Sequence, residues 1–541
     1  MKTSKNILYA SALGMCLIIG NTSCVGDLDT TPLAKTEVVA DNVFTNELSS
    51  YTSAIAKIYA GLAITGNKSG DNEVDIAGVD GGSQASFLRG LWNLQQLPTD
   101  EAHCCWGDAG VNDLNILSWN SGNLFIKGFY YRLLYQVQVS NAYLRQTTDE
   151  LLVSRGVSDA DKVIVKTYRA EARFHRALAY FYLLDMFRNV PFPTETTEIG
   201  SFPDQTDPVS LFGYIESELK GIENDLIDPF VGYDTSNYGR VTKAADWALL
   251  SRLYLNANVY TGTDKYTESV TYSNKVLNVG YQLEPIYENM FKADNHNSKE
   301  MIFPVRYDGD QTMTWGGMTF LLCSMEPSDM QSTINAAGAW KGNRGRSSML
   351  ATFKKESSSD KDSRIKMLYT DKTANIEIVS PADYADNGIP VVKFNNTNSD
   401  GSLPISNQAW VDFPLFRLGE IYLNYAEAVL RGGQGGDRAT ALGYINELRK
   451  RAYSDQAVAP VKDADFTLQF ILDERGREFF YEAQRRTDLV RFGQLTTADY
   501  VWPWKGGLNT GRAVSAHFAV FPLPADEVGS NTKLKQNEGY N

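Results

Sequence analysis

The chain has 541 residues, and 65 acidic against 51 basic side chains give it a formal net charge of −14 at pH 7. This balance argues against a nucleic-acid partner, because phosphates require a basic face. Aromatic residues make up 12% of the chain, which is more ring surface than a core alone usually needs.

The first 24 residues have the pattern of an export signal that ends at a cysteine. Two lysines precede a mostly apolar run at residues 7–20, which is too short for a membrane span of about 20 residues. Small residues stand directly before Cys24, as in bacterial lipoproteins. We expect residues 1–23 to be a cleaved signal peptide and the Cys24 thiol to carry a lipid that anchors residues 24–541 to a membrane. An ordinary secretory signal with an incidental cysteine is the alternative.

Amphipathic helices dominate the rest of the chain. Residues 160–187 are the clearest case, because their apolar side chains recur on one face with a period of 3.6 residues. Four further segments share this period: 241–258, 412–431, 438–453 and 470–493. The second and third of these are joined by GGQGGD and predict a helical hairpin of the tetratricopeptide kind, although no strict 34-residue repeat is present. An irregular helical domain is the alternative.

Two long segments, residues 64–120 and 296–410, are rich in Gly, Asn, Ser and Asp and carry isolated aromatic residues. They are too long and too aromatic for plain linkers. Long excursions from a helical scaffold are where binding sites usually lie, so we expect the ligand site there. Short strands are expected within the second segment, at residues 301–309 and 389–394.

The cysteines do not form a disulfide framework. Apart from Cys24 and one cysteine in the signal, the chain has Cys104, Cys105 and Cys323. Either member of the adjacent pair could bridge to Cys323, but not both. Because the chain has no CxxC pair and only four scattered histidines, ordinary zinc spacing is missing, and we expect no metal and no other cofactor.

Several long blocks follow one another in a familiar order. They are YRAEARFHRALAYFYLLDMFRNVPF, GRVTKAADWALLSRLYLNANVYTG, FRLGEIYLNYAEAVLR, INELRKRAY, ERGREFFYEAQRRTDLVRFG and, at the C-terminus, FPLPADEVGSNTKLKQNEGYN. With these blocks, essentially the whole mature chain resembles the SusD/RagB family of Bacteroidetes outer-membrane lipoproteins. The VGDLD segment after Cys24 is similar to the acidic surface-export signal of these lipoproteins.

The resemblance implies one mainly α domain over residues 24–541. Tetratricopeptide-like helix pairs at about 122–290 and 412–493 would form its scaffold, and the loops at 64–120 and 296–410 would carry the ligand site. It also implies a lipid-anchored protein on the cell surface that captures glycans, or peptides in some branches. Such a protein would act as a lid on a SusC-like TonB-dependent transporter and would not be an enzyme.

Local motifs are most similar to the starch-binding branch of that family. They are LPTDE (97–101), GGMTFLLC (316–323) and WPWKGG (502–507). Starch or another α-glucan is therefore the expected ligand, and another neutral glycan is the alternative.

Sugar rings present flat C–H faces that stack on aromatic planes, while polar side chains bind the hydroxyl groups. Trp106, Trp315 and Trp340 each have a glycine close by and lie off the helical stripes, and Arg89 offers a planar fork of donors. Burial in the core is the alternative for each tryptophan. The resemblance implies that these four residues match the aromatic arc and the arginine of the starch-binding branch. We expect the rings to converge as a curved platform with Arg89 at its edge.

The match to that branch is incomplete. The branch has a further Trp and an Asn in the first loop, where this chain has Cys104 and Ala109. Asp108 or Asn112 would have to compensate, and we include Asp108 among the candidate glycan-binding residues.

A glycosidase is the alternative from another class, and it would need two carboxylates across the scissile bond. The acids of DERGRE (473–478) do not supply a specific pair, since Glu474, Arg477 and Glu478 share one helical face in the usual salt-linked pattern. No GxSxG, Walker or HExxH motif is present. Some relatives hold calcium near the block around Asp412, but His296 stands where a carboxylate would help, so we expect no metal there.

Overall fold

The computed structural model describes residues 43–325, 329–381, 387–453 and 458–540. The predicted signal peptide and Cys24 lie outside the described residues. Within these ranges the chain is mainly helical with a few short strands, which confirms the predicted fold class. None of the described helices is both long and apolar enough to cross a membrane.

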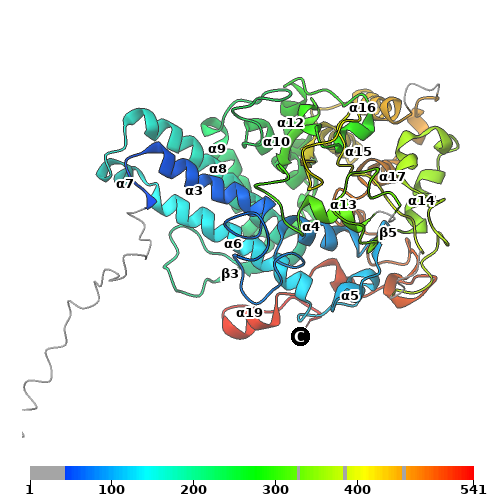
Figure 1. Ribbon diagram of the computed structural model, residues 1–541, viewed down its shortest axis with the longest axis horizontal. Coiled ribbons are helices and arrows are strands. Elements are labelled where there is room, and N and C mark those ends of the chain that lie inside the picture. Colours follow the sequence, from blue (N-terminus) through cyan, green and yellow to red (C-terminus); the bar gives the residue numbers. More distant parts are fainter. Residues whose placement is uncertain (1–42, 326–328, 382–386, 454–457, 541) are drawn as a thin grey trace, which may run out of the picture.

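Three long helices of the N-terminal half, α3, α6 and α8, lie side by side along the long axis of the molecule (Figure 1). The helices of this half are α3 (Leu48–Ala63), α4 (Phe87–Gln96), α5 (Val111–Ile116), α6 (Leu124–Gln146), α7 (Asp149–Ser154), α8 (Asp159–Phe187) and α9 (Pro208–Ile222). Helix α8 confirms the helix predicted at 160–187. Ser158 caps its start by accepting the Asp161 N–H at 3.1 Å, and Arg188 ends it with a φ of 63°.

The second half of the scaffold packs its helices in sequence, α10 against α12, α12 against α15 and α15 against α16. Its helices are α10 (Lys243–Leu255), α11 (Ala257–Thr261), α12 (Tyr266–Leu277), α13 (Met318–Ser324), α14 (Ser347–Lys354), α15 (Leu418–Leu430), α16 (Arg438–Ala452), α17 (Leu468–Phe479), α18 (Arg485–Arg491) and α19 (Ala525–Ser530). The predicted hairpin is α15 and α16, and the helix predicted at 241–258 is divided at Asn256 into α10 and α11.

Within the described ranges, six short strands form three antiparallel pairs. They are β1 (Ala102–Cys104) with β5 (Asn343–Gly345), β2 (Val190–Pro191) with β3 (Gln205–Thr206), and β4 (Met301–Val305) with β6 (Phe413–Arg417). Strand β4 confirms the strand predicted at 301–309. At 389–394 the structure has no named strand, only isolated bridges from Ile389 to Gly345 and from Val391 to Leu368.

The helix predicted at 412–431 is wrong at its start, because its first residues form β6. All five residues of β6 are buried, so the segment has no polar face that would distinguish a strand from a buried helix. Pro414 is the local signal against a helix, since proline removes a backbone donor and clashes with the preceding turn.

The helix predicted at 470–493 is broken between α17 and α18. Tyr481 and Ala483 take positive φ values of 64° and 59° at this break. The break leaves the Phe480 carbonyl free to accept from the Lys393 ammonium at 2.8 Å, and Glu482 accepts from the same ammonium at 2.5 Å. This buried tertiary contact explains a break that helical periodicity does not indicate.

A buried group of ions, which we call the glutamate cluster, joins α17 to distant segments. Glu478 pairs with Arg364 at 2.9 Å, with Arg417 at 2.7 Å and with Arg451 at 2.5 Å. Burial opposes ionisation of Glu478, but the three guanidinium groups outweigh it and hold its pKa well below the usual range. One turn earlier Glu474 pairs with Arg477 at 2.8 Å, as the helical spacing predicts.

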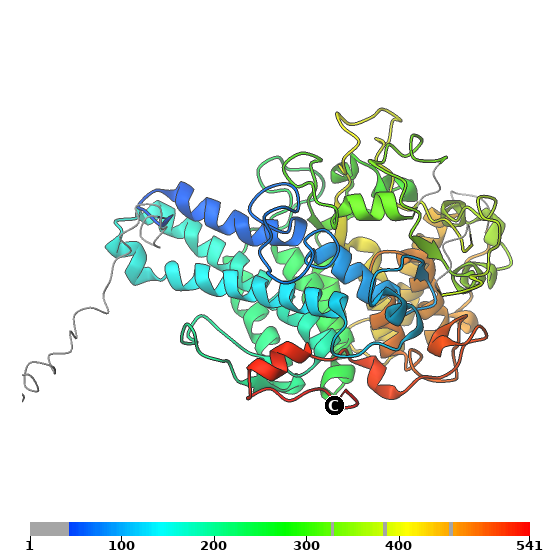
Figure 2. The same cartoon turned by 60° about the horizontal axis from the view of Figure 1, so that its bottom comes forward.

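The C-terminal segment returns to the N-terminal half, where α19 lies against α6 (Figure 2). Asp526 pairs with Lys127 at 2.8 Å, and Glu527 accepts from the Tyr131 hydroxyl at 3.2 Å. The segment at 64–120 is less irregular than its composition suggests, because α4 and α5 lie within it and every residue of α4 is buried.

Candidate functional site

The structure brings Trp106, Trp315 and Trp340 together in one row, which we call the tryptophan arc. The ring centroids of Trp106 and Trp340 are 6.4 Å apart, and those of Trp315 and Trp340 are 5.9 Å apart. Successive ring planes are tilted by 52° and 55°, so the three rings do not lie in one plane. Trp315 is 41% exposed, and the other two rings are half-buried. Their role in binding stays a prediction.

The pairing of β1 with β5 sets the spacing of two of these rings. Trp106 follows β1 by two residues and Trp340 precedes β5 by three. The Cys105 N–H extends the pairing by donating to the Gly342 carbonyl at 2.9 Å. The Trp106 indole N–H then donates to the Trp340 carbonyl at 3.3 Å. Backbone pairing thus brings together two tryptophans that are more than 200 residues apart in the sequence.

Glycine makes room for the rings of the arc. A Cβ atom on Gly342 would overlap the Trp106 ring, and one on Gly338 would lie 2.6 Å from Trp340 Nε1. Both distances are too short for any other residue without a shift of the ring. The glycines that flank these tryptophans in the sequence therefore have a direct packing role.

Asp71 holds the loop that carries Trp315. Its Oδ2 accepts the Trp315 backbone N–H at 2.9 Å, and its Oδ1 accepts the hydroxyls of Thr314 at 2.6 Å and Thr65 at 2.8 Å. A Cβ on Gly82 would lie 3.0 Å from Asp71 Oδ2 and 3.1 Å from Trp315 Cβ. Sequence reasoning missed Asp71, because one acid in a loop rich in Gly and Asp carries no signal of a contact 244 residues away.

Arg89 lies on α4 at the edge of the arc. Its guanidinium carbon is 5.2 Å from the Trp106 ring centroid and 4.6 Å from that of Phe320, and its Nη1 donates to the Gly82 carbonyl at 3.3 Å. Among the described residues its Nε has no hydrogen-bond partner. Burial lowers the pKa of Arg89, but an arginine stays charged through any ordinary shift. The guanidinium is held between two rings and is only 7% exposed, and its role in binding stays a prediction.

Phe320 is a second residue that sequence reasoning missed. It belongs to the GGMTFLLC motif on α13 and is fully buried, so its apolar neighbours gave it the signature of a core residue.

Asp108 lies in the loop between Trp106 and α5, where its side chain is exposed. Asn112 is also exposed, whereas Cys104 is buried. Asp108 and Asn112 are thus accessible near the arc and Cys104 is not.

The three cysteines of the described chain, Cys104, Cys105 and Cys323, are buried and are not joined by disulfides. Neither bridge that the sequence allowed is formed. Burial raises the pKa of Cys104 to about 12, so this thiol stays protonated and unreactive at neutral pH.

The carboxylate of Asp412 is hydrogen-bonded to other groups of the protein. It accepts the Tyr238 hydroxyl and the Tyr307 backbone N–H, each at 2.7 Å, and burial raises its pKa to about 6. His296 packs against the ring of Tyr233, with centroids 4.9 Å apart. In the part of the chain that the structure describes, no three His, Cys, Asp or Glu side chains are grouped as metal ligands.

Comparison with known proteins gives concordant results. The SusD family model matches residues 330–540. The starch-binding protein SusD of Bacteroides thetaiotaomicron is 34% identical over 580 aligned residues, which cover 98% of this chain and 98% of that protein.

Two solved structures share the fold. Surface glycan-binding protein A from Bacteroides fluxus has a TM-score of 0.69 at 21% identity, and covers 91% of this chain and 99% of its own. Surface glycan-binding protein A from Bacteroides thetaiotaomicron in complex with laminarihexaose has a TM-score of 0.67 at 21% identity, with 90% and 99% covered. Because the 34% identity extends over nearly the whole of both chains, the chain belongs to the SusD family.

Proposed function

We propose that this chain is a lipid-anchored glycan-binding protein of the outer membrane surface. It captures starch or a related α-glucan on the tryptophan arc and delivers it to a SusC-like TonB-dependent transporter. The observation that carries the proposal is the arc itself, in which three tryptophans from distant segments meet beside the Arg89 guanidinium.

The tilt between successive rings of the arc favours a glycan whose sugar faces also turn along its length. Its rings are tilted by 52° and 55° from one to the next, so a flat ribbon such as cellulose could lie on only one ring at a time. A helical α-glucan turns its successive apolar faces and can meet all three. Arg89 at the edge would donate to paired hydroxyl groups, since its planar fork matches two acceptors at once.

The named relatives support glycan binding and leave the linkage to experiment. The relative that is 34% identical is named a starch-binding protein, which favours an α-glucan. One structural neighbour was solved with laminarihexaose, so another neutral glycan is the second candidate.

We propose binding without turnover. Glycosidases need a second carboxylate about 5–10 Å from the first across the scissile bond. Near the arc, the carboxylate of Asp71 already accepts three hydrogen bonds from the protein. Asp108 is exposed on a loop. Asp71 therefore serves to order the Trp315 loop, and Asp108 has no burial that would set it apart as a catalytic acid.

A glycan panel tests the ligand. Isothermal titration calorimetry with maltoheptaose, laminarihexaose and cellohexaose should give measurable affinity for maltoheptaose and the weakest for cellohexaose. Trp340→Ala should weaken maltoheptaose binding roughly tenfold or more, since one stacked ring is worth about 1–3 kcal/mol by analogy with bases on aromatics. Tyr444→Ala is the matched control, because it removes a partly exposed ring that stacks on Tyr422 in the α15–α16 hairpin.

A preference for laminarihexaose would replace starch as the ligand while keeping the arc as the site. Unchanged affinity in Trp340→Ala for a glycan that the parent binds would place the site elsewhere. Release of reducing sugar in proportion to purified protein would favour the glycosidase alternative.

The anchor has its own test, which rests on the signal pattern that ends at Cys24. Cys24→Ala should move the protein from the membrane fraction to the soluble fraction. Pull-down of the lipidated protein in mild detergent should recover a large β-barrel protein. A Cys24→Ala chain that stays membrane-bound and surface-exposed would contradict the lipoprotein assignment.

A further inference from the structure

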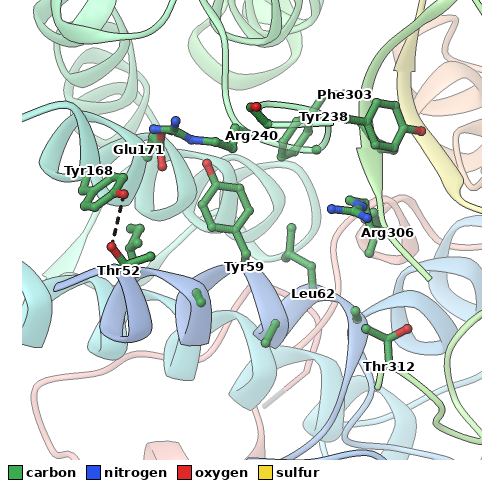
Figure 3. A pocket seen from close by; sticks show the side chains of 18 residues that line it. Thr52, Tyr59, Leu62, Tyr168, Glu171, Tyr238, Arg240, Phe303, Arg306 and Thr312 are labelled. Carbon is green, nitrogen blue, oxygen red and sulfur yellow. Dashed lines mark hydrogen bonds and ion pairs between the residues drawn. The ribbon is translucent and has the colours of Figure 1, made fainter. Parts of the chain in front are cut away.

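A cavity of about 430 Å³ lies between α3 and the segments 236–240 and 303–306 (Figure 3). No residue of the tryptophan arc lines it. Its volume falls in the range of about 300–1,000 Å³ that is typical of small-molecule sites. The proposed glycan function does not use this cavity.

One side of the cavity is an apolar face of α3. Ala56, Ala60 and Ala63 recur at a helical spacing on this face, and their small side chains leave the cavity open. Phe303 and Val305 of β4 line the cavity as well. A ligand must therefore bury an apolar body here.

Most polar groups at one end of the cavity are hydrogen-bonded within the protein, and Glu171 Oε2 is a buried oxygen without a partner among the described residues. Glu171 accepts from Arg240 Nε at 3.0 Å, which leaves the pair without net charge. The hydroxyls of Thr52 and Tyr168 share a hydrogen bond of 3.2 Å, drawn as a dashed line in Figure 3. The Tyr59 hydroxyl accepts a backbone N–H at 2.9 Å. A sugar with many hydroxyl groups would find few free partners at this end.

Arg306 is an exposed cation in the lining of the cavity. Its guanidinium points into the cavity in Figure 3, and among the described residues no carboxylate pairs with it. Its position is built into the fold, because a Cβ on Gly239 would overlap the Arg306 side chain and Gly239 takes a φ of +84°. The guanidinium carbon also lies 5.5 Å from the Tyr238 ring centroid.

We propose that this cavity is a second binding site, for an amphipathic carboxylate whose charged group meets Arg306 and whose apolar body lies on α3. No described carboxylate is ion-paired with this exposed guanidinium, although the Asp412 carboxylate interacts with it electrostatically. A guanidinium binds a carboxylate through two parallel hydrogen bonds. The alanine face is suited to an alkyl chain, which needs no hydrogen-bond partners. The site is independent of the glycan function and takes a different chemical class.

Sodium dodecanoate below its micelle concentration is the probe, with the soluble chain lacking residues 1–24 and isothermal titration calorimetry as the measurement. We expect saturable binding at one site. Dodecanol, which lacks the carboxylate, and butyrate, which lacks the long chain, should each bind at least tenfold more weakly.

Two variants locate the site. Arg306→Gln removes the charge and should weaken dodecanoate binding about tenfold or more. Ala56→Phe fills the cavity from an exposed position of α3 and should abolish binding. Ser53→Phe is the matched control, because it puts the same ring on an exposed position of α3 that does not line the cavity. Lys366→Gln controls for the loss of one exposed positive charge.

Thermal melts and maltoheptaose titrations of each variant should match those of the parent, so that a loss of dodecanoate binding is separate from a loss of fold and from the glycan site. Three results would overturn the proposal: no saturable binding of dodecanoate, equal binding of dodecanol, or binding that survives both Arg306→Gln and Ala56→Phe.

Discussion

The tryptophan arc and the glutamate cluster both gather side chains from distant parts of the chain, but they hold them in opposite ways. In the glutamate cluster, Glu478 and its three arginines are buried and ion-paired with one another, and the arginines also pair with neighbouring carboxylates. In the arc, Trp315 keeps 41% of its surface exposed, and loop backbone fixes the rings. Buried ion pairs within the protein contribute to the stability of the fold, whereas an exposed ring surface is available to a ligand.

The largest expected effect is on stability, at the glutamate cluster. Glu478→Gln removes one carboxylate from a buried network in which the three arginines keep other carboxylate partners: Asp362, Glu474, Glu300 and Glu482. Because one buried positive charge then lacks its counter-charge, the free energy of unfolding should fall by about 3–5 kcal/mol. Urea unfolding followed by circular dichroism measures this change. Glu447→Gln on α16 is the control, because Glu447 is exposed. The affinity of the folded Glu478→Gln protein for maltoheptaose should be unchanged. A loss of affinity together with the loss of stability would contradict the distinction between the stabilising cluster and the binding arc.

The same carboxylate makes the stability of the parent fall in acid. The pKa of Glu478 is lowered in the folded chain, so below its unfolded pKa of about 4.3 the unfolded state binds more protons. The contribution is complete above that pH and is lost as the pH falls. Glu478→Gln should therefore flatten the slope of unfolding free energy against pH below about 4.3.

The next effect is on binding, at the arc. Trp315→Ala should weaken maltoheptaose binding roughly tenfold, with little change in melting temperature, because an exposed ring adds little to the core. Tyr233→Ala is the control, since Tyr233 is a ring of similar exposure outside the arc. A large drop in melting temperature for Trp315→Ala would mean that the ring is a core residue after all.

The smallest effect is expected from Asp71, which orders Trp315 without lying in the row of rings. Asp71→Ala removes the acceptor for the Trp315 N–H and should weaken binding several-fold, less than loss of the ring itself. Asp71→Asn should restore part of the affinity, because its amide oxygen can still accept that N–H. Asp310→Ala is the control, because Asp310 is an exposed residue of the loop that carries Trp315. Equal affinities for Asp71→Ala and the parent would show that the ring orders itself.

Local patterns in the sequence predicted the scaffold well. The period of apolar residues located α8 almost to its ends, because one buried face is repeated over 29 residues. The same reasoning failed where burial is complete on all sides, as in β6, and where a tertiary contact interrupts a helix, as at Tyr481 and Ala483. Periodicity reports which face is buried, and it carries no information on what the buried groups contact.

Sequence reasoning named the residues of the candidate site, and it missed the residues that hold them in place. The resemblance and the loop context indicated Trp106, Trp315, Trp340 and Arg89. Asp71 and Phe320 escaped, because their roles depend on contacts across the chain rather than on nearby residues. No local pattern of charge or hydrophobicity distinguishes such residues from their neighbours.

Because β1 and β5 pair directly, the distance between the Trp106 and Trp340 rings does not depend on the length of the loops next to these residues. Trp106 and Trp340 leave the same end of one ribbon of three residue pairs, so their distance is set by register. Residues could be inserted in the 329–339 stretch, or after Trp106, without moving the rings apart. Loop lengths could then diverge among relatives and change which sugars are accepted, while the stacking platform stays constant.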